Sequence, residues 1–553
     1  MINFDALTLK AFIAENINFL SGATIKKIQQ ASRRELILHL RNNGENKKLY
    51  ININPEFFHI CFCEDLQKRG IKIPDEAPMF CMLLRKYLQN GKIKRIVQPH
   101  GERIIEFHFE YKDVLEEVQT LCLATELMGK YSNIILYDYD TKIIVGCAHN
   151  VGEEKSKYRE LAGTIPYIYP QKQNKEDILN TDFETFQKKH DDNLDETSLA
   201  FELSSDYYYL TNPLIKQILK TINKDFNDKD FLKILFKKIQ ETVSLTNVDY
   251  SINEDYSEYS IVPKLNNNSK KTINEMIDDY FEYNQIKKIL KQKKAKIYTH
   301  IDTQIKKADK QINNFKEKLS DSEKAEKYRL KGDILMMNTK EKVSPKIKLI
   351  NPYNNEPLEI ELDERYTIVQ NANRYYKLYK KTKSAIDYAN SQIKEIEELK
   401  SMYEEQKFYT DIASSIEETE EIGFELGIKT EIIKKNKKQN TKQINLETYE
   451  FEDFKVYLGK NSIQNDYLLS KIASPDDLWF HPLNMHGAHV ILKRNNKKIP
   501  DDVLLSCAKL AKRFSKAQNN AKIPIIYTER KYVKKANSKI AFVTYKNEKE
   551  IYC

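Results

Sequence analysis

The sequence predicts a multidomain α+β protein: a mixed α/β amino-terminal domain, a small helical module, a long antiparallel coiled-coil hairpin and an α/β carboxy-terminal module. Its 553 residues exceed the roughly 250–300 residues at which a single hydrophobic core stops growing. Apolar residues alternate with period two near both ends of the chain and recur every three or four residues in its middle. The first pattern is typical of half-buried strands and the second of helices.

Residues 1–172 are predicted to form the amino-terminal domain. Residues 5–19 have helical spacing, and residues 77–92 predict a second helix, which Gly91 ends. Short alternating runs predict antiparallel strands with one buried face. These runs lie at residues 35–40, 48–53, 103–109, 121–127 and 133–138.

Residues 173–268 are polar and rich in Asn and Asp, with short helical patches. We interpret them as a small helical module, and a partly flexible linker is the alternative. The sequence is least informative in this region.

Residues 269–430 are predicted to form a coiled-coil hairpin with a small tip at about 332–364. Lys, Glu and Gln fill the positions between the apolar seams, and the proline-containing tip has an extended character. At 1.5 Å per residue, arms of roughly 50 residues reach about 75 Å, which suits a spacer or a probe. A dimerisation coil is the alternative, and we expect a monomer. The first seam consists of Ile297, Ile301, Ile305, Ala308, Ile312, Phe315 and Leu319, and the second of Ile386, Ala389, Ile393 and Ile396.

Residues 431–445 form a basic linker that is rich in Lys, Asn and Gln. Such runs are usually solvated tethers, although some bind phosphates. Residues 446–553 predict an α/β module, in which strand-like runs flank a helix at 501–516.

Composition limits the class of protein. The 90 Lys and Arg residues exceed the 81 Asp and Glu residues, which gives a net charge of +9, so a polyanion is a reasonable partner. The seven cysteines are scattered without a CxxC pair, which indicates neither a disulfide framework nor a zinc ribbon. No signal peptide or membrane span is indicated, and we expect a cytoplasmic protein with no membrane partner.

Residues 476–492 hold the only tryptophan together with His481, His486 and His489. The spacing of these histidines matches no helical pair of ligands, and no acidic residue lies among them, so we expect no metal site. Each histidine alone could be structural, but beside Trp479 and nearby lysines they favour stacking and phosphate contact. No nucleophile elbow and no phosphate-binding loop occur. We therefore expect no catalytic residue and no cofactor.

Three groups of motifs resemble the NFACT family, also called the fibronectin-binding protein A family. Its carboxy-terminal module is resembled by GKNSIQNDYLLSKIASPDDLWFHPLNMHGAHVIL (459–492) and FSKAQNNAKIPIIYTERKYVKKANSKIAFVTY (514–545). Its amino-terminal domain is resembled by PMFCMLLRKYL (78–88) and ELMGKYSNIIL (126–136). Its middle is resembled by YRLKGDIL (328–335) and ELDERYTIVQNANRYYKLYKKTK (361–383). The resemblance covers nearly the whole chain in order.

The resemblance implies ribosome-associated quality control. Such a protein would bind stalled large ribosomal subunits that carry peptidyl-tRNA and recruit alanyl-tRNA for untemplated tailing of the nascent chain, which marks it for degradation. Its partners would be the rRNA and proteins of the large subunit, tRNA and the nascent chain. It would not be an enzyme, because the ribosome would supply peptidyl transfer while the protein positions the tRNA.

The resemblance also implies a fold and a set of sites. The amino-terminal domain would resemble that of formamidopyrimidine-DNA glycosylase and hold the tRNA, and a helix-hairpin-helix module would follow it. The expected tRNA-binding residues are Glu102, Arg103, Arg85, Lys86, Lys130 and Asn133. In the carboxy-terminal module, the residues expected to face RNA or the ribosome are Lys460, Asn465, Lys471, Trp479, His481, His489, Lys531, Lys534 and Lys535.

Two departures from the family pattern bear on tailing. Glu102 stands where the family has Asp, which moves the carboxylate by one methylene. His59 stands where the family has Arg, which would remove a forked phosphate donor. The alternatives are a fibronectin-binding adhesin, which the lack of a signal peptide disfavours, and an RNA-binding scaffold without tailing activity. A DNA glycosylase is disfavoured because Ile2 replaces the amino-terminal proline of those enzymes.

Overall fold

The computed structural model forms two compact units, Met1–Lys288 and Ile289–Cys553, and the boundary between them falls within helix α7. The predicted linker at 431–445 lies almost entirely outside the described residues. None of the helices in the described ranges is both long and apolar enough to cross a membrane. The structure describes residues 4–66, 68–112, 118–154, 156–190, 195–222, 228, 230–263, 268–319, 322–428, 444, 446–520, 522–535 and 543–553.

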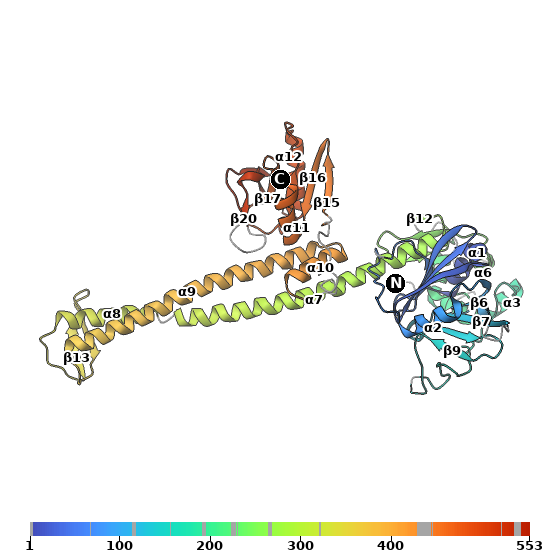
Figure 1. The fold of residues 1–553 in the computed structure, drawn as a ribbon, viewed down its shortest axis with the longest axis horizontal. Helices are drawn as coiled ribbons and strands as arrows, with labels where there is room; N and C mark the ends of the chain where they lie inside the picture. The colour runs from blue at the N-terminus through green and yellow to red at the C-terminus, as the bar shows by residue number, and fades with distance from the viewer. Residues whose placement is uncertain are drawn as a thin grey trace. The chain divides into compact units, whose positions relative to one another are not determined.

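Unit 1 contains two antiparallel sheets, with strand orders β1-β2-β3-β4 and β5-β6-β7-β8-β9 (Figure 1). Each predicted alternating run lies within a strand apart from at most one end residue, and both predicted helices are present, which confirms the mixed α/β fold. Asp5 caps the first helix, because its carboxylate accepts from the backbone N–H of Thr8. The elements are α1 Ala6–Leu20, β1 Thr24–Ser32, β2 Glu35–Asn42, β3 Glu45–Asn52, β4 His59–Phe62, α2 Met79–Leu88, β5 Ile93–Val97, β6 Ile104–Lys112, β7 Val118–Glu126, β8 Asn133–Asp138 and β9 Ile144–Cys147.

The rest of unit 1 is mainly helical. It contains a three-stranded sheet of order β11-β10-β12, which the sequence did not predict because strands of two or three residues show no alternation. Helices in the described residues of this region pack into the core of unit 1, as expected of a helical module. The elements are α3 Phe183–Lys189, α4 Glu196–Asp206, α5 Asn212–Lys220, α6 Phe231–Val243, β10 Tyr250–Ile252, β11 Tyr259–Ser260 and β12 Asn268–Lys270.

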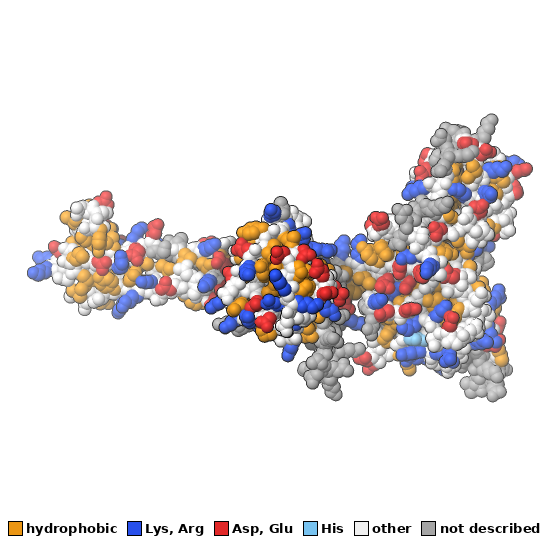
Figure 2. All heavy atoms as spheres, turned by 90° about the horizontal axis from the view of Figure 1, so that it is seen from above, with side chains coloured by type: hydrophobic (Ala, Val, Ile, Leu, Met, Phe, Trp, Pro, Cys, Tyr) orange, Lys and Arg blue, Asp and Glu red, His pale blue; other side chains and the backbone are white. Residues whose placement is uncertain are grey.

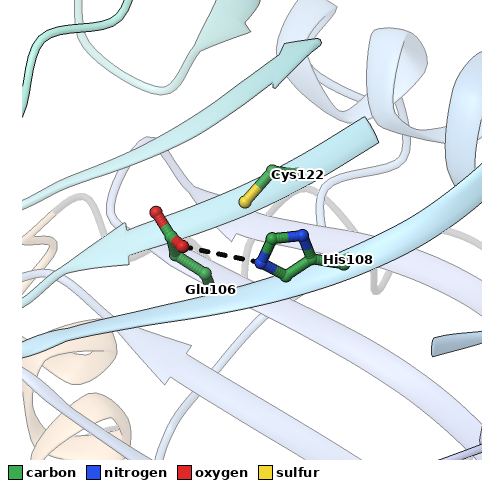
Figure 3. A group of neighbouring side chains, drawn as sticks. All are labelled: Glu106, His108 and Cys122. Atoms are coloured by element: carbon green, nitrogen blue, oxygen red, sulfur yellow. Dashed lines mark ion pairs between the residues drawn. The ribbon is translucent and has the colours of Figure 1, made fainter. Parts of the chain in front are cut away.

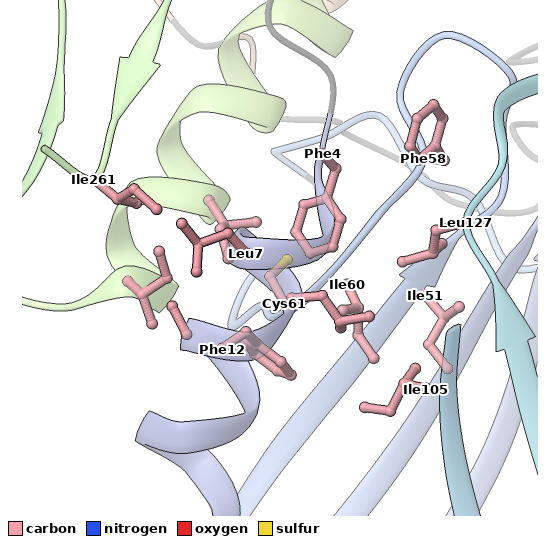
Figure 4. Close-up of a cluster of buried hydrophobic side chains, with 14 of the residues drawn as sticks. Phe4, Leu7, Phe12, Ile51, Phe58, Ile60, Cys61, Ile105, Leu127 and Ile261 are labelled. Carbon is pink, nitrogen blue, oxygen red and sulfur yellow. The ribbon is translucent and has the colours of Figure 1, made fainter. Parts of the chain in front are cut away.

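A large hydrophobic core joins most elements of unit 1, and a smaller separate cluster around Tyr137 and Leu161 covers part of the five-stranded sheet. The large core extends from Phe4 to Phe281 and includes side chains from the first sheet, α1 and the helical module. Figure 4 shows part of this cluster, with Phe12 and Ile60 close to one another and Ile261 near Leu7. The predicted boundary at residue 172 stays a prediction, but the core continues across it.

A buried arginine joins the first sheet to the beginning of α7. The side chain of Arg69 is fully buried, and its guanidinium pairs with Asp278. The guanidinium also stacks over Tyr50 at 5.2 Å and lies 3.9 Å from Glu282. This ion pair fixes the first turns of α7 on unit 1.

In unit 2, the two long helices pair within one chain, as predicted. Lys407 forms an ion pair with Asp302 at 2.8 Å, and Lys400 forms one with Asp309 at 2.7 Å. As one residue number rises, the other falls, so the two arms are antiparallel. Ile301 is fully buried and Ala308 is 3% exposed, which confirms the first predicted seam. The arms are α7 Ile273–Leu319, α8 Ser322–Met337 and α9 Ile368–Ile412, followed by α10 Ile416–Glu425.

The tip of the hairpin is a two-stranded antiparallel sheet of β13 Lys346–Ile350 and β14 Pro357–Glu361. Ile347, Leu349 and Ile360 are buried against α8 and the beginning of α9. The predicted extended tip at about 332–364 therefore lies partly in α8 and partly in this sheet.

The carboxy-terminal module is a six-stranded antiparallel sheet of order β15-β16-β18-β17-β19-β22. Alternating residues face opposite sides: Phe480 packs in the cluster that contains α12, whereas Trp479 packs against Leu468 and Leu469. The elements are β15 Glu447–Phe451, β16 Phe454–Gly459, α11 Ser462–Tyr467, β17 Leu478–Pro482, β18 His489–Leu492, α12 Asp501–Arg513, β19 Pro524–Glu529, β20 Lys534–Lys535, β21 Val543–Thr544 and β22 Lys549–Tyr552.

Candidate nucleic-acid interface

A broad groove in unit 1 lies beside the turn between β1 and β2. Its volume is about 1320 Å³. Its walls come from this turn, the beginning of α2, the loop between β7 and β8, and the segment after β9. The groove therefore lies where loops from both large sheets meet.

Three basic side chains of the groove are free to meet a phosphate. Arg33, Arg34 and Lys130 line it and are exposed. Within the described parts of the chain, none of them forms an ion pair with an acidic residue. Arg159 also lines the groove, but it makes a two-pronged contact with Glu126, at 2.7 and 2.5 Å. The unpaired cations are the kind of groups that bind nucleic-acid backbones.

Exposed apolar side chains accompany these cations. Met79 is 88% exposed, Tyr131 65% and Tyr158 56%, and all three line the groove. Such flat or flexible groups stack well against unpaired bases. Cations beside exposed rings are typical of a surface for a looped or single-stranded RNA segment.

The predicted tRNA-binding residues do not form one cluster. Lys130 lines the groove as an exposed cation, and Lys86 is exposed on α2. Asn133 is 1% exposed. Its Nδ2 donates to the carbonyl oxygen of His149 at 2.8 Å, and its Oδ1 accepts from the backbone N–H of His149 at 3.1 Å. Arg85 donates twice to the carbonyl oxygen of Ile28, at 3.0 and 2.9 Å. Asn133 lies along the groove, but its side chain is committed to the fold, so the structure corrects the prediction for Asn133. Arg85 is only partly buried, and its contact with tRNA stays a prediction.

Glu102 and Arg103 follow the short turn Pro99–Gly101 and lie outside the lining of the groove. Gln173 donates to the Glu102 carboxylate at 3.2 Å, and burial raises the pKa of Glu102. The guanidinium of Arg103 lies over the ring of Phe58 at 5.4 Å. Both side chains are only partly buried, and their contact with tRNA stays a prediction.

His59 does not lie on a phosphate-binding surface. Its ring is fully buried and stacks on Phe281 at 4.3 Å. Its Nε2 faces the guanidinium of Arg69 at 3.3 Å, and burial keeps the pKa of His59 well below its usual value. The expected loss of a phosphate donor at this position is therefore wrong for this chain.

Four residues expected to face RNA in the carboxy-terminal module are instead buried. Trp479 is fully buried, His489 is 2% exposed, Lys460 5% and Asn465 1%. His481 stacks on Trp479 with ring centres 5.4 Å apart, and burial lowers the pKa of His481 to about 4. Trp479 and His489 are core groups because strand alternation directs them inward, so the prediction that these two rings face RNA is wrong. His481 is only partly buried, and its contact with RNA stays a prediction.

The motif at 459–466 packs the carboxy-terminal module on the base of the hairpin. Asn461 and Gln464 donate to the carboxylate of Glu421, at 2.8 and 3.1 Å. Asn465 donates to the hydroxyl of Tyr409 at 3.0 Å, and Nζ of Lys460 lies 3.5 Å from the carboxylate of Glu418 in α10. These polar residues thus join two parts of unit 2.

The other predicted lysines are exposed. Lys531 pairs with Glu529 at 2.5 Å, and Lys535 pairs with Asp466. Lys471 and Lys534 form no ion pair with the described residues. In the view of Figure 2, basic and acidic side chains are interspersed over the surface. RNA contact by the exposed lysines stays a prediction.

Sequence reasoning missed Arg33 and Arg34. Their signal was present, because two adjacent arginines directly precede the alternating run at 35–40, and the structure places them in the turn between β1 and β2. Turn residues carry no core constraint, so a basic pair there indicates a binding surface.

Comparisons with known proteins cover the whole chain. Residues 5–445 match the family of NFACT N-terminal and middle domains, and residues 446–544 match the NFACT protein RNA binding domain. The chain is 27% identical to the Rqc2 homolog RqcH of Bacillus subtilis, over 100% of this chain and 98% of that protein. It is 28% identical to the Rqc2 homolog RqcH of Streptococcus suis, with the same coverage.

A solved structure of the amino-terminal part of the fibronectin/fibrinogen-binding protein from Streptococcus suis is 25% identical, with a TM-score of 0.44. The match covers 51% of this chain and 100% of the solved chain. The family matches extend in order from residue 5 to residue 544 and agree with the sheets, the hairpin and the carboxy-terminal module. This chain belongs to the NFACT family.

Proposed function

We propose that this protein acts in ribosome-associated quality control as a factor that binds tRNA and the large ribosomal subunit. The observation that carries the proposal is a groove with three unpaired cations and exposed aromatic rings in a chain that also has an NFACT RNA-binding domain. The full-length similarity to RqcH proteins supports the same pathway.

In this proposal the groove holds a looped segment of tRNA. Arg33, Arg34 and Lys130 neutralise its phosphates, and the exposed side chains of Tyr131 and Met79 contact unstacked bases. The protein positions alanyl-tRNA on a stalled subunit in the cytoplasm, and the ribosome joins alanine to the nascent chain. Proximity supplies the rate enhancement, so no catalytic side chain of this protein is required.

The variant Arg33→Ala/Arg34→Ala/Lys130→Ala is expected to bind tRNA at least roughly tenfold more weakly near physiological salt. The slope of log affinity against log salt is expected to fall by about one for each phosphate that the variant no longer neutralises. Filter binding of the full-length protein to tRNA over a salt series measures both quantities.

The matched control is Lys220→Ala/Lys233→Ala/Lys237→Ala, which removes the same charge from exposed positions of α5 and α6. It is expected to bind tRNA as the wild type does. Equal weakening in the two triple variants would mean that net charge, and not the groove, binds the tRNA.

Sequencing of the RNA captured with tagged protein from its host tests the whole proposal. Enrichment of large-subunit rRNA over small-subunit rRNA, together with one tRNA species, is expected. Subunit rRNA without tRNA would indicate a scaffold that does not tail. Capture of neither RNA, together with surface labelling on intact cells, would favour an adhesin.

A further inference from the structure

Three potential metal ligands converge inside the five-stranded sheet of unit 1. Glu106 and His108 are two residues apart on β6 and so point to the same face, and Cys122 lies directly opposite His108 on β7. The three side chains are 2%, 3% and 0% exposed. One ligand atom from each lies within 4.8 Å of the others, and Figure 3 shows the carboxylate, the ring and the sulfur directed toward one another.

The charges of this sheet face are only partly balanced by protein groups. Glu126, on the same face, is neutralised by the guanidinium of Arg159 at 2.5 Å. Among the described residues, Glu106 has no Lys or Arg partner and lies 3.5 Å from His108. A buried carboxylate without a counter-charge is costly, so this position favours a cation.

The hydrogen bonds leave the ligand atoms available. Tyr137 and Tyr169 donate to Oε1 of Glu106, at 2.9 and 2.5 Å, which orients the carboxylate and leaves Oε2 toward His108. Within the described structure, Nε2 of His108 is buried without a hydrogen-bond partner. An oriented carboxylate beside a free ring nitrogen is the usual arrangement of a metal site with supporting hydrogen bonds.

We propose that Glu106, His108 and Cys122 bind a divalent transition-metal ion of the zinc type, which joins β6 to β7. Carboxylate, imidazole and thiolate together select zinc or a similar thiophilic ion over magnesium or calcium. Bonds of about 2.0–2.3 Å place tetrahedral zinc ligands roughly 3.3–3.8 Å apart. The ligand atoms lie within 4.8 Å of one another, so each pair needs to close by about 1.0–1.5 Å at most.

The charge balance of binding is simple. The Cys122 side chain is fully buried, which favours the neutral thiol, so the metal-free site holds a thiol and the carboxylate. Binding breaks the S–H bond, releases that proton to solvent and forms a metal–sulfur bond. The thiolate and the carboxylate then neutralise the two positive charges of the ion. Three protein ligands leave the fourth position to water or to a tyrosine oxygen.

Metal content of the full-length protein, purified from cells grown with zinc, tests the site. About one zinc per chain is expected in the wild type, and less than about a tenth in Glu106→Gln and Cys122→Ser. Protein refolded with Co(II) is expected to show a thiolate-to-cobalt absorption band that Cys122→Ser abolishes. Cys81→Ser is the matched control, because Cys81 is equally buried but its Sγ lies 3.6 Å from the Ile28 carbonyl oxygen.

Glu106→Gln keeps the shape of the side chain, so this variant can lose the metal without losing the fold. Circular dichroism measures whether the variant is folded. The wild type is expected to melt higher with zinc than after chelation, and Glu106→Gln is expected to melt at one temperature in both conditions. Wild-type protein without zinc and without the cobalt band would overturn the proposal. Full zinc content in both Glu106→Gln and Cys122→Ser would overturn it as well.

Discussion

Arg69→Met is expected to lower the free energy of unfolding of unit 1 by about 3–5 kcal/mol, because it leaves Asp278 near the core without its partner. The same change removes the contact of the guanidinium with the Tyr50 ring and its donation to the Asp278 carbonyl oxygen at 3.1 Å. Hydrogen exchange with mass spectrometry measures the destabilisation in peptides from β4 and from the first turns of α7.

Two further variants test whether the unpaired charge of Asp278 causes the destabilisation. In Arg69→Met/Asp278→Asn the unpaired charge is gone, so much of the stability is expected to return. Lys94→Met removes an exposed ion pair with Glu110, whose two side chains are 46% and 54% exposed, and is expected to cost less than about 1 kcal/mol. A destabilisation by Arg69→Met no larger than that by Lys94→Met would contradict the structural role of the buried pair.

Glu405→Gln is expected to stabilise unit 2 at pH 8 by up to about 3 kcal/mol. Glu405 is 8% exposed, and burial raises its pKa to about 7 from an ordinary value of 4.5. The folded state therefore holds the proton more tightly than the unfolded state does. Stability falls as the pH rises from 4.5 toward 7 and changes little above that range.

Glutamine keeps the acceptor for the hydroxyl of Tyr409, which donates to Glu405 at 2.8 Å. Unfolding is followed by the fluorescence of Trp479, the only tryptophan of the chain, which is fully buried in unit 2. Glu397→Gln, at an exposed position of the same helix, is expected to leave the pH dependence as in the wild type. A Glu405→Gln protein that loses stability between pH 5 and pH 8 as steeply as the wild type would refute this assignment.

Residue periodicity was sufficient to predict the architecture. Strands such as 133–138 and the seam from Ile297 to Ile312 were predictable because burial of one face imposes a period that is visible in the residues. The motifs at 459–492 and 126–136 also predicted the family, which the matches over residues 5–445 and 446–544 confirm.

Which polar residues face solvent depends on contacts between elements that are distant in the chain. Lys460, Asn465 and His489 have the composition of an RNA-binding surface, yet they are buried, and Lys460 and Asn465 contact the acidic and aromatic groups that meet them there. The convergence of Glu106, His108 and Cys122 depends on the register of β6 against β7. Arg69 pairs with Asp278, which lies 209 residues further along the chain. Periodicity reports which face of an element is buried, whereas the partner of a polar side chain depends on contacts between elements distant in the chain.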